Sequence, residues 1–413
     1  MGTRYPQRFS RAGKRRGSGG RAIALQLESD RLPIAARPRT ILFLSASVGE
    51  GHTAAAQAVS LAAIDRWPDA QCHVVDSYRY ASHVFHRVAS NGYLGMVKVL
   101  PQLYRYIYEQ AERATKVSAF KSWLHHYTAV NMRQYMEDFA PDVVVCTHAF
   151  PCGVMAEYKR EFSDAPPVIG IVTDFVVHPF WIHKNIDAYA VATNAMKQAL
   201  VLRGVLADRV RVTGIPIDGK FARPISKSTA RDIIGIERNR TTLLLMGGGL
   251  GIGPLEKALV ALDEVSFDVQ TVVVVGKNER LERRLADVAQ RLRHPVVVRG
   301  FVDNVCDYMR AADVLVSKPG GLTSSEALAS GLPLVMLRPL PGQEERNTRY
   351  LQERGVGIRV QTSRELAPAI DDLLGNAAAL ERMRRAARSL AHPDAAESIT
   401  QIIARLGRRV PRA

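Results

Sequence analysis

The sequence predicts an α/β protein built from two doubly wound, Rossmann-like domains, and three observations support this prediction. Short runs rich in valine and isoleucine alternate with helical segments along most of the 413 residues. Near-continuous apolar runs of this kind are typical of parallel strands that helices cover on both faces. The alternation stops once, at a segment rich in proline and glycine, and then restarts. A chain of this length is also too long for one compact core.

The first domain is expected over residues 39–220. Its strands are expected in the runs ILFLSAS, CHVVDSY, DVVVCTH, PVIGIVTDF, AYAVAT and VRVTGIPI. An alanine-rich stretch predicts a helix from Thr53 to Trp67. The interval from Tyr78 to Tyr127 is an insertion rich in aromatic residues, which forms either a core helix pair or an amphipathic lip that meets lipid. The segment GIPIDGKFARP, residues 214–224, is expected to link the two domains.

The second domain is expected over residues 221–413, with strands in the runs TTLLLM, QTVVVV, HPVVVR, ADVLVS and LPLVML. Its last part, from Pro368 to Arg408, has a helical pattern. Residues 1–38 are expected to form a disordered basic tail, since seven arginines and lysines precede the first acid at Glu28. Such a tail can contact lipid headgroups, and an arginine-rich, acid-poor start is also typical of a transit peptide.

Composition restricts the classes of function. The net charge of +16 favours a polyanionic neighbour, either nucleic acid or the anionic inner face of a membrane. No apolar run approaches the roughly 20 residues that a membrane span needs. The four cysteines form no C-x-x-C pair, which argues against a zinc site or a disulfide framework. We therefore expect a cytoplasmic protein that does not span the bilayer.

The segment SASVGEGHTAAA places His52 in a glycine-bracketed turn between a strand and a helix. Such turns direct backbone N–H groups and the positive end of the helix dipole toward an anion. The pattern is neither of the common nucleotide-binding fingerprints, because a histidine stands where they have lysine or glycine. His52 therefore either caps the helix or takes part in chemistry, and on its own the structural role is favoured.

Glycine-rich and polar segments follow several predicted strands, so they converge on the cleft between the carboxyl ends of the two sheets. The loop GGGLGIG allows the backbone to approach a ligand closely. In SKPGGLTSSEALASG, Glu326 lies on the first turn of a helix, where a carboxylate can accept both hydroxyls of a ribose while nearby N–H groups hold a diphosphate. Alternatively, Glu326 only complements the helix dipole. Gln343 and Asn347, one helical turn apart, suit a polar clamp on sugar hydroxyls.

These segments together resemble a family. The motifs VGEGHTAAAQA, VTDFVVHPFW, VTGIPI and SKPGGLTSSEALASGLPLVM…PGQEERN are similar to those of the glycosyltransferases that make monogalactosyl- or glucosyl-diacylglycerol. They are also similar to the transferase that adds N-acetylglucosamine to the lipid-linked peptidoglycan precursor. The resemblance covers about residues 39–390. It implies a GT-B fold with two domains facing each other across a cleft, a UDP-hexose donor held mainly by the second domain, a lipid acceptor held by the first, inversion at the anomeric carbon and no bound metal.

The resemblance also implies roles for individual residues. Glu326 would bind the uridine ribose, and Phe301 and Val302 would contact uracil by backbone more than by side chain. The diphosphate would lie near a group of small residues, namely Gly247, Gly248, Gly249, Gly320, Gly321 and Thr323. Gln343, Glu344 and Asn347 would hold the hexose. The loop after the first strand of the second domain has Leu250 where some relatives carry an acidic or polar residue, so no side-chain contact is expected from it.

Inverting transfer needs a base for the acceptor hydroxyl and a means of holding the departing UDP. His52 can serve as this base, since an unperturbed imidazole has a pKa near ~6.5. Asp174 is the alternative base, or it orients the imidazole. Gly51, His148 and His178 are assigned to the acceptor side. Without a metal-binding motif, helix N-termini and glycine-loop N–H groups are expected to stabilise the diphosphate.

The sequence therefore predicts a hexosyltransferase that moves glucose or galactose from UDP-glucose or UDP-galactose to diacylglycerol at the inner face of the cell membrane. A transferase for another lipid-linked or small-molecule acceptor is the first alternative. A nucleotide-sugar sensor or nucleic-acid-binding protein is the second, although interleaved aromatic platforms and a helix-turn-helix pattern are missing. A lipid acceptor predicts exposed aromatic and basic residues between 78 and 127.

Overall fold

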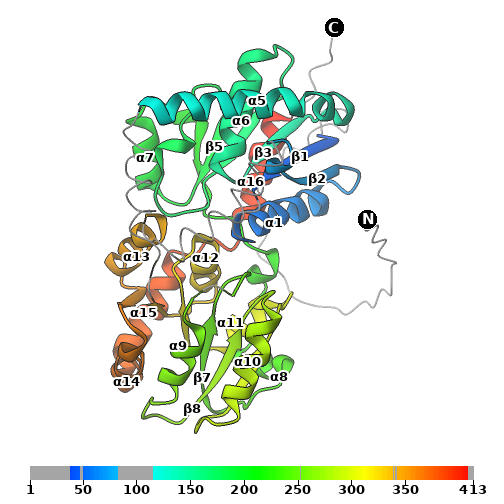
Figure 1. The fold of residues 1–413 in the computed structure, drawn as a ribbon. Coiled ribbons are helices and arrows are strands. Elements are labelled where there is room, and N and C mark those ends of the chain that lie inside the picture. The colour runs from blue at the N-terminus through cyan, green and yellow to red at the C-terminus, as the bar shows by residue number, and fades with distance from the viewer. Residues whose placement is uncertain are drawn as a thin grey trace, which may run out of the picture.

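The computed structural model describes residues 38–46, 50–81, 115–251, 253–337, 339 and 342–407. Residues 1–37 of the predicted basic tail and residues 82–114 of the aromatic insertion lie outside the described residues. Two lobes lie one above the other in Figure 1, each with a central sheet flanked by helices. The α/β architecture with two Rossmann-like domains is confirmed.

The first domain contains a six-stranded parallel sheet in the order β2-β1-β3-β4-β5-β6. The strands are β1 (Thr40–Ser45), β2 (Gln71–Asp76), β3 (Val143–Cys146), β4 (Val168–Ile171), β5 (Ala188–Val191) and β6 (Val210–Val212). The helices that follow them are α1 (Glu50–Arg66), α5 (Thr115–Phe139), α6 (Ala149–Glu161) and α7 (Asn194–Val201). Strands β3, β4 and β5 are buried along their whole length, which explains their unbroken apolar sequences.

The second domain repeats this plan with a parallel sheet in the order β12-β11-β10-β7-β8-β9. The strands are β7 (Thr241–Met246), β8 (Val269–Val274), β9 (Val296–Arg299), β10 (Val314–Ser317), β11 (Leu334–Leu337) and β12 (Gly357–Val360). The helices are α8 (Lys227–Ile234), α9 (Leu255–Leu262), α10 (Glu279–Ala289), α11 (Val305–Ala311), α12 (Gly321–Ala329), α13 (Gln343–Glu353), α14 (Leu366–Gly375) and α15 (Ala377–Ser389).

Two segments cross between the domains. One leads from β6 to α8 and contains the predicted linker, and the other leads from α15 to the last helix, α16 (Ala395–Leu406). The two crossings touch, because a Cβ placed on Gly214 would lie 2.3 Å from Cβ of His392. Gly214 also has a φ of 86°, so only glycine meets both requirements of this crossing.

Helix α16 departs from the domain boundary that the sequence predicts. Residues 221–413 were all assigned to the second domain, but α16 returns to the first, where Ile399 and Ile403 pack in the same cluster as Ile41 and Phe43. In Figure 1, α16 is the red helix inside the upper lobe. An amphipathic pattern predicts that a helix covers apolar surface, but it does not identify the sheet that supplies this surface.

Candidate active site

His52 lies where three neighbouring strands of the first sheet end. Helix α1 begins at Glu50, three residues before the predicted Thr53, so His52 belongs to its first turn. His52 Nδ1 is 3.0 Å from the carbonyl oxygen of Thr147 and 2.8 Å from Oγ1 of Thr173. Thr147 directly follows β3, and Thr173 comes two residues after β4. The carboxyl ends of β1, β3 and β4 therefore hold the imidazole in one orientation.

The hydrogen bonds of His52 fix its tautomer. Because a carbonyl oxygen can only accept, Nδ1 carries the proton and donates it to Thr147. The Thr173 hydroxyl donates to the same carbonyl at 3.4 Å. The neutral ring therefore keeps its lone pair on Nε2, and within the described residues no hydrogen bond occupies that atom. Burial lowers the pKa of His52, while the charge of Asp174 and the Thr147 carbonyl act in the opposite direction, so the neutral form is favoured.

Asp174 follows Thr173 and is 9% exposed. Its Oδ1 accepts a hydrogen bond of 3.0 Å from Nδ2 of Asn347, on α13 of the second domain. Burial raises the pKa of Asp174, whereas the Asn347 hydrogen bond and the charge of His52 lower it. The sequence leaves Asp174 either as the alternative base or as the group that orients His52. In the structure Thr147 and Thr173 hold the imidazole, and neither threonine is among the residues predicted from sequence.

Asn347 joins the two domains. Its side chain is fully buried, and Nδ2 donates to the Pro319 carbonyl at 3.1 Å as well as to Asp174. Its Oδ1 accepts from the backbone N–H of Phe175 at 3.0 Å. The amide that the sequence analysis assigned to hexose hydroxyls is thus engaged with protein groups on both sides of the domain contact. Gln343 and Glu344, at the start of the same helix, lie closer to the surface.

The other two candidate histidines cap helices. His148 lies at the N-terminus of α6, where Nδ1 accepts from the N–H of Phe150 at 3.1 Å. His178 accepts in the same way from the N–H of Phe180 at 3.2 Å. The His148 ring also packs edge-on against His52, with 4.6 Å between ring centroids. Burial, with His52 as a second cause, moves the pKa of His148 well below its ordinary value, so His148 is a neutral neighbour of His52.

The second domain presents glycine-rich backbone to this site. Strand β7 is followed by Gly247, Gly248 and Gly249, and Gly248 has a φ of 69°. A Cβ on Gly249 would lie 2.5 Å from Cγ of Glu50 at the start of α1. This close approach requires glycine and brings the loop to the first turn that carries His52.

The N-terminus of α12 also meets the first domain. A Cβ on Gly321 would lie 1.9 Å from the Thr173 carbonyl oxygen, and one on Gly51 would lie 3.6 Å from Cβ of Leu322. The N-cap residue, Gly320, provides no side-chain hydrogen bond to the helix. The first N–H groups of α12, with Thr323 among them, therefore have no side-chain cap at the point where the two domains meet.

Glu326 lies further along α12 and is 8% exposed. Its backbone oxygen accepts from Ser330, but in the described part of the chain its carboxylate has no hydrogen-bond or ion-pair partner. Burial, helped by the charge of Asp218, raises the pKa of Glu326 to about 8. Buried carboxylates are normally paired, so the Glu326 carboxylate is a candidate for binding a ligand.

Phe301 and Val302 follow the end of β9. The Phe301 side chain is 62% exposed, and the Lys277 ammonium lies 5.6 Å from its ring centroid. Lys277 also pairs with Glu50 at 2.8 Å across the domain boundary. Phe301 therefore lies near the glycine-loop side of the site with its side chain exposed, whereas Val302 is half-buried against the core.

Neither a metal centre nor a membrane span emerges from the described residues. Their His, Cys, Asp and Glu side chains form no group of three or more that would hold an ion. None of their helices has both the length and the apolar composition needed to cross a bilayer.

Comparisons with known proteins cover nearly the whole chain. Residues 52–217 match the family of monogalactosyldiacylglycerol (MGDG) synthases, and residues 242–399 match the C-terminal domain of glycosyltransferase family 28. A processive diacylglycerol beta-glucosyltransferase from Bacillus pumilus is 30% identical over 367 residues, covering 88% of this chain and 94% of its own. The Bacillus subtilis protein of the same name is 29% identical over the same shares of both chains.

Solved structures confirm the two-domain GT-B fold. Acinetobacter baumannii MurG superposes with a TM-score of 0.58 at 15% identity, covering 89% of this chain and all of its own. Anabaena Alr3699/HepE in complex with UDP superposes with a TM-score of 0.52 at 14% identity, with the same coverage.

Proposed function

The chain belongs to the family of the MGDG synthases and processive diacylglycerol beta-glucosyltransferases, and on this premise we propose which sugar it transfers and how its residues act. It is a UDP-sugar-dependent hexosyltransferase that acts on diacylglycerol. The acceptor that the sequence analysis ranked first is therefore confirmed, in preference to another lipid-linked or small-molecule acceptor.

Glucose is the proposed hexose. The relatives that align over 88% of the chain are named beta-glucosyltransferases, whereas the galactolipid synthase family matches residues 52–217 alone. UDP-glucose carries an α-linked sugar, so a β-linked product requires inversion at the anomeric carbon. Inversion in a single step calls for a base on the side of the sugar opposite the leaving UDP.

His52 is the proposed base. The oxygen of the acceptor hydroxyl forms a bond to the anomeric carbon, and its proton passes to Nε2 of His52. The bond between the anomeric carbon and the β-phosphate oxygen breaks, and its electron pair leaves with UDP. The observation that carries this role is the fixed tautomer, since Thr147 and Thr173 hold Nδ1 and leave Nε2 available. The buried charge of Asp174 favours the imidazolium that forms.

The second domain is proposed to hold the donor. The uncapped N-terminus of α12, with Gly320, Gly321 and Thr323, provides N–H groups and the positive end of a helix dipole for the leaving diphosphate. Gly247, Gly248 and Gly249 place their backbone on the other side of the diphosphate. Glu326 accepts the ribose hydroxyls, Phe301 and Val302 contact uracil, and Gln343 and Glu344 contact the hexose. Lys318, which pairs with Glu344 at 3.3 Å, orients that carboxylate.

The enzyme is proposed to act at the surface of a membrane. On α5, Trp123, Tyr127 and Val130 are 57%, 39% and 47% exposed and lie on one face at helical spacing. The Trp123 and Tyr127 rings stack at 5.7 Å. Exposed aromatic side chains on the acceptor domain favour contact with the lipid interface. Trp123 and Tyr127 fall within residues 78–127, where a lipid acceptor predicts exposed aromatic and basic residues, and residues 82–114 of that range lie outside the described residues.

Purified protein with diacylglycerol vesicles and radiolabelled UDP-glucose or UDP-galactose tests the choice of sugar. We expect β-linked glucolipid from UDP-glucose and far slower labelling from UDP-galactose. Faster transfer of galactose would overturn the sugar assignment and leave the transferase activity standing. Flotation of Trp123→Ser with the same vesicles, compared with Trp67→Phe as a control in the core, tests the contact of α5 with lipid.

A further inference from the structure

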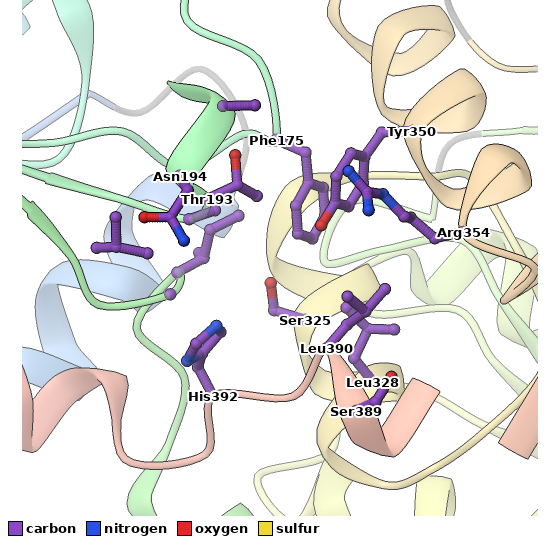
Figure 2. Close-up of a pocket in the computed structure, with 15 residues that line it drawn as sticks. Phe175, Thr193, Asn194, Ser325, Leu328, Tyr350, Arg354, Ser389, Leu390 and His392 are labelled. Atoms are coloured by element: carbon purple, nitrogen blue, oxygen red, sulfur yellow. The ribbon is translucent and has the colours of Figure 1, made fainter. Parts of the chain in front are cut away.

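Two aromatic rings stack across the domain boundary. Phe175 directly follows Asp174 in the first domain, and Tyr350 lies on α13 in the second. The ring centroids are 4.9 Å apart and the ring planes differ by 9°. Figure 2 shows the two rings side by side, with the Arg354 side chain next to Tyr350. Stacked rings stabilise a contact beyond the apolar area that they bury, so this stack favours the docked arrangement of the domains.

The face of α13 that carries Tyr350 also carries residues of the site. Gln343, Asn347 and Tyr350 follow one another at intervals of four and three residues, so they share one face of the helix. Gln343, on the first turn, is proposed to contact the hexose. Seven residues of helix, about 10 Å, separate it from Tyr350. One rigid helix therefore connects the proposed hexose contact with the stack on Phe175.

Helix α13 holds the segment Asp174–Phe175 at three points. Asn347 Nδ2 donates to Oδ1 of Asp174 at 3.0 Å, and Asn347 Oδ1 accepts from the N–H of Phe175 at 3.0 Å. The ring stack is the third point, one helical turn further along. A cavity of about 290 Å³ borders the stack, and residues of both domains line it. Close packing is interrupted there, so each contact that does cross the boundary has a larger share in holding the domains together.

The place of Asp174 affects the chemistry of His52. The charge of Asp174 raises the pKa of His52, and the hydrogen bond from Asn347 lowers the pKa of Asp174. Both effects weaken with distance. If α13 moved away from the segment that carries Asp174, the support for the imidazolium that forms during transfer would weaken as well.

We propose that Phe175 and Tyr350 are positioning residues for the transferase reaction. Their stack holds α13 against the segment that carries Asp174, so that a hexose at the start of α13 is aligned with His52. The two rings act through Asn347 and Asp174, without contact to the sugar. The proposal rests on the roles proposed above for His52 and for the start of α13. A hexose that contacts α13 in the docked arrangement stabilises this arrangement in turn.

Three variants of the full chain test the stack in turnover. Tyr350→Leu removes the ring and Tyr350→Phe keeps it. Tyr158→Leu is the matched control, because Tyr158 contacts Phe162 within the first domain, with 4.5 Å between ring centroids. We expect kcat with UDP-glucose to fall about threefold to tenfold in Tyr350→Leu and to stay near the wild-type value in the other two variants. Affinity for UDP should be unchanged in all three, since UDP lacks the hexose that reaches α13. A fall in kcat of the same size in Tyr350→Phe or in Tyr158→Leu would overturn the proposal.

Hydrogen exchange of the Phe175 amide measures the docking without turnover. Because this N–H donates to Asn347, its exchange should be about threefold to tenfold faster in Tyr350→Leu than in wild type or in Tyr158→Leu. In wild type, UDP-glucose should slow the exchange more than UDP does, and this difference should shrink in Tyr350→Leu. Equal exchange in Tyr350→Leu and wild type would show that the stack does not hold the segment, and the proposal would be wrong. Exchange in the free protein depends neither on the base nor on the sugar, so a failure of the proposed function leaves this comparison intact.

Discussion

The two faces of the interdomain contact differ in whether the groups proposed to act as base and to bind the nucleotide already have protein partners. On the first-domain face, His52 Nδ1, Thr173 and Asp174 already have protein partners. On the second-domain face, α12 has no side-chain cap and the Glu326 carboxylate has no partner among the described residues. A base must be oriented before its substrate arrives, whereas a nucleotide site keeps its donors and acceptors for the ligand. Substitution of His52 on the first-domain face should therefore lower turnover, whereas substitution of Glu326 on the second-domain face should weaken nucleotide binding.

The largest effect is expected for His52→Gln. Removing a general base typically slows turnover by about 100-fold to 10,000-fold. Affinity for UDP should stay unchanged, because His52 belongs to the face that does not hold the nucleotide. Turnover and calorimetric UDP affinity measured on the same preparation test both halves of this expectation.

His148→Gln is the matched control, since that ring packs against His52 but its Nδ1 caps α6. Losing a cap typically costs about 1 kcal/mol of folding free energy, which appears as a lower melting temperature with a much smaller change in turnover. Near-normal turnover of folded His52→Gln would instead mean that His52 is structural and that Asp174 is the base.

The fold was predictable from sequence because buried parallel strands are continuous apolar runs, as β3 and β10 show. The partners of His52 were not, because Thr147 and Thr173 are 95 and 121 residues away from it in sequence. Each is a polar residue close behind a buried strand, and this position at a strand end was the available signal. Asn347 was recognised as a site residue, but its role depends on how the two domains dock, which no local pattern encodes.

Glu326→Gln should weaken UDP binding by roughly 10-fold to 100-fold, because hydrogen bonds to a charged acceptor contribute about 1.5–3 kcal/mol each. Turnover at saturating donor should change little by comparison. The result is checked by UDP titration and by the separate effects on KM and kcat. A collapse of kcat at unchanged UDP affinity would contradict the contrast between the two faces.

Glu326 also predicts a pH dependence. Its pKa of about 8 means that the free protein holds this carboxyl mostly protonated at pH 7. Ribose hydroxyls bind the carboxylate form more strongly, so UDP binding releases a proton, and affinity rises with pH until it levels off above the pKa. We expect about tenfold tighter binding at pH 9 than at pH 7. Glu326→Gln should show no such rise, and equal slopes in both proteins would refute the assignment.

Asn347→Ser should reduce turnover by about tenfold and should also destabilise the protein. The Phe175 N–H and the Pro319 carbonyl each lose a partner, at about 1–3 kcal/mol for each buried group left unsatisfied. Loss of the hydrogen bond to Asp174 raises the pKa of that carboxyl further, so Asp174 stays protonated to higher pH. The acid limb of the kcat profile should therefore move to higher pH. A residue that only clamps the hexose would raise KM for UDP-glucose and leave this limb in place.

The smallest effect is expected for removal of the Glu50–Lys277 ion pair, which joins the two faces. The atoms are 2.8 Å apart, but the side chains are 36% and 55% exposed. Exposed pairs typically contribute about 0.2–1 kcal/mol, and salt screens them over a Debye length of about 8 Å. A double-mutant cycle of Glu50→Gln and Lys277→Met, read as KM for UDP-glucose, isolates this coupling from the separate contact of Lys277 with Phe301. We expect a coupling of less than about fivefold that disappears at high salt. A larger coupling that persists in salt would mean that the closed contact is maintained by this pair as well as by Asn347, and that the first-domain face takes part directly in donor binding.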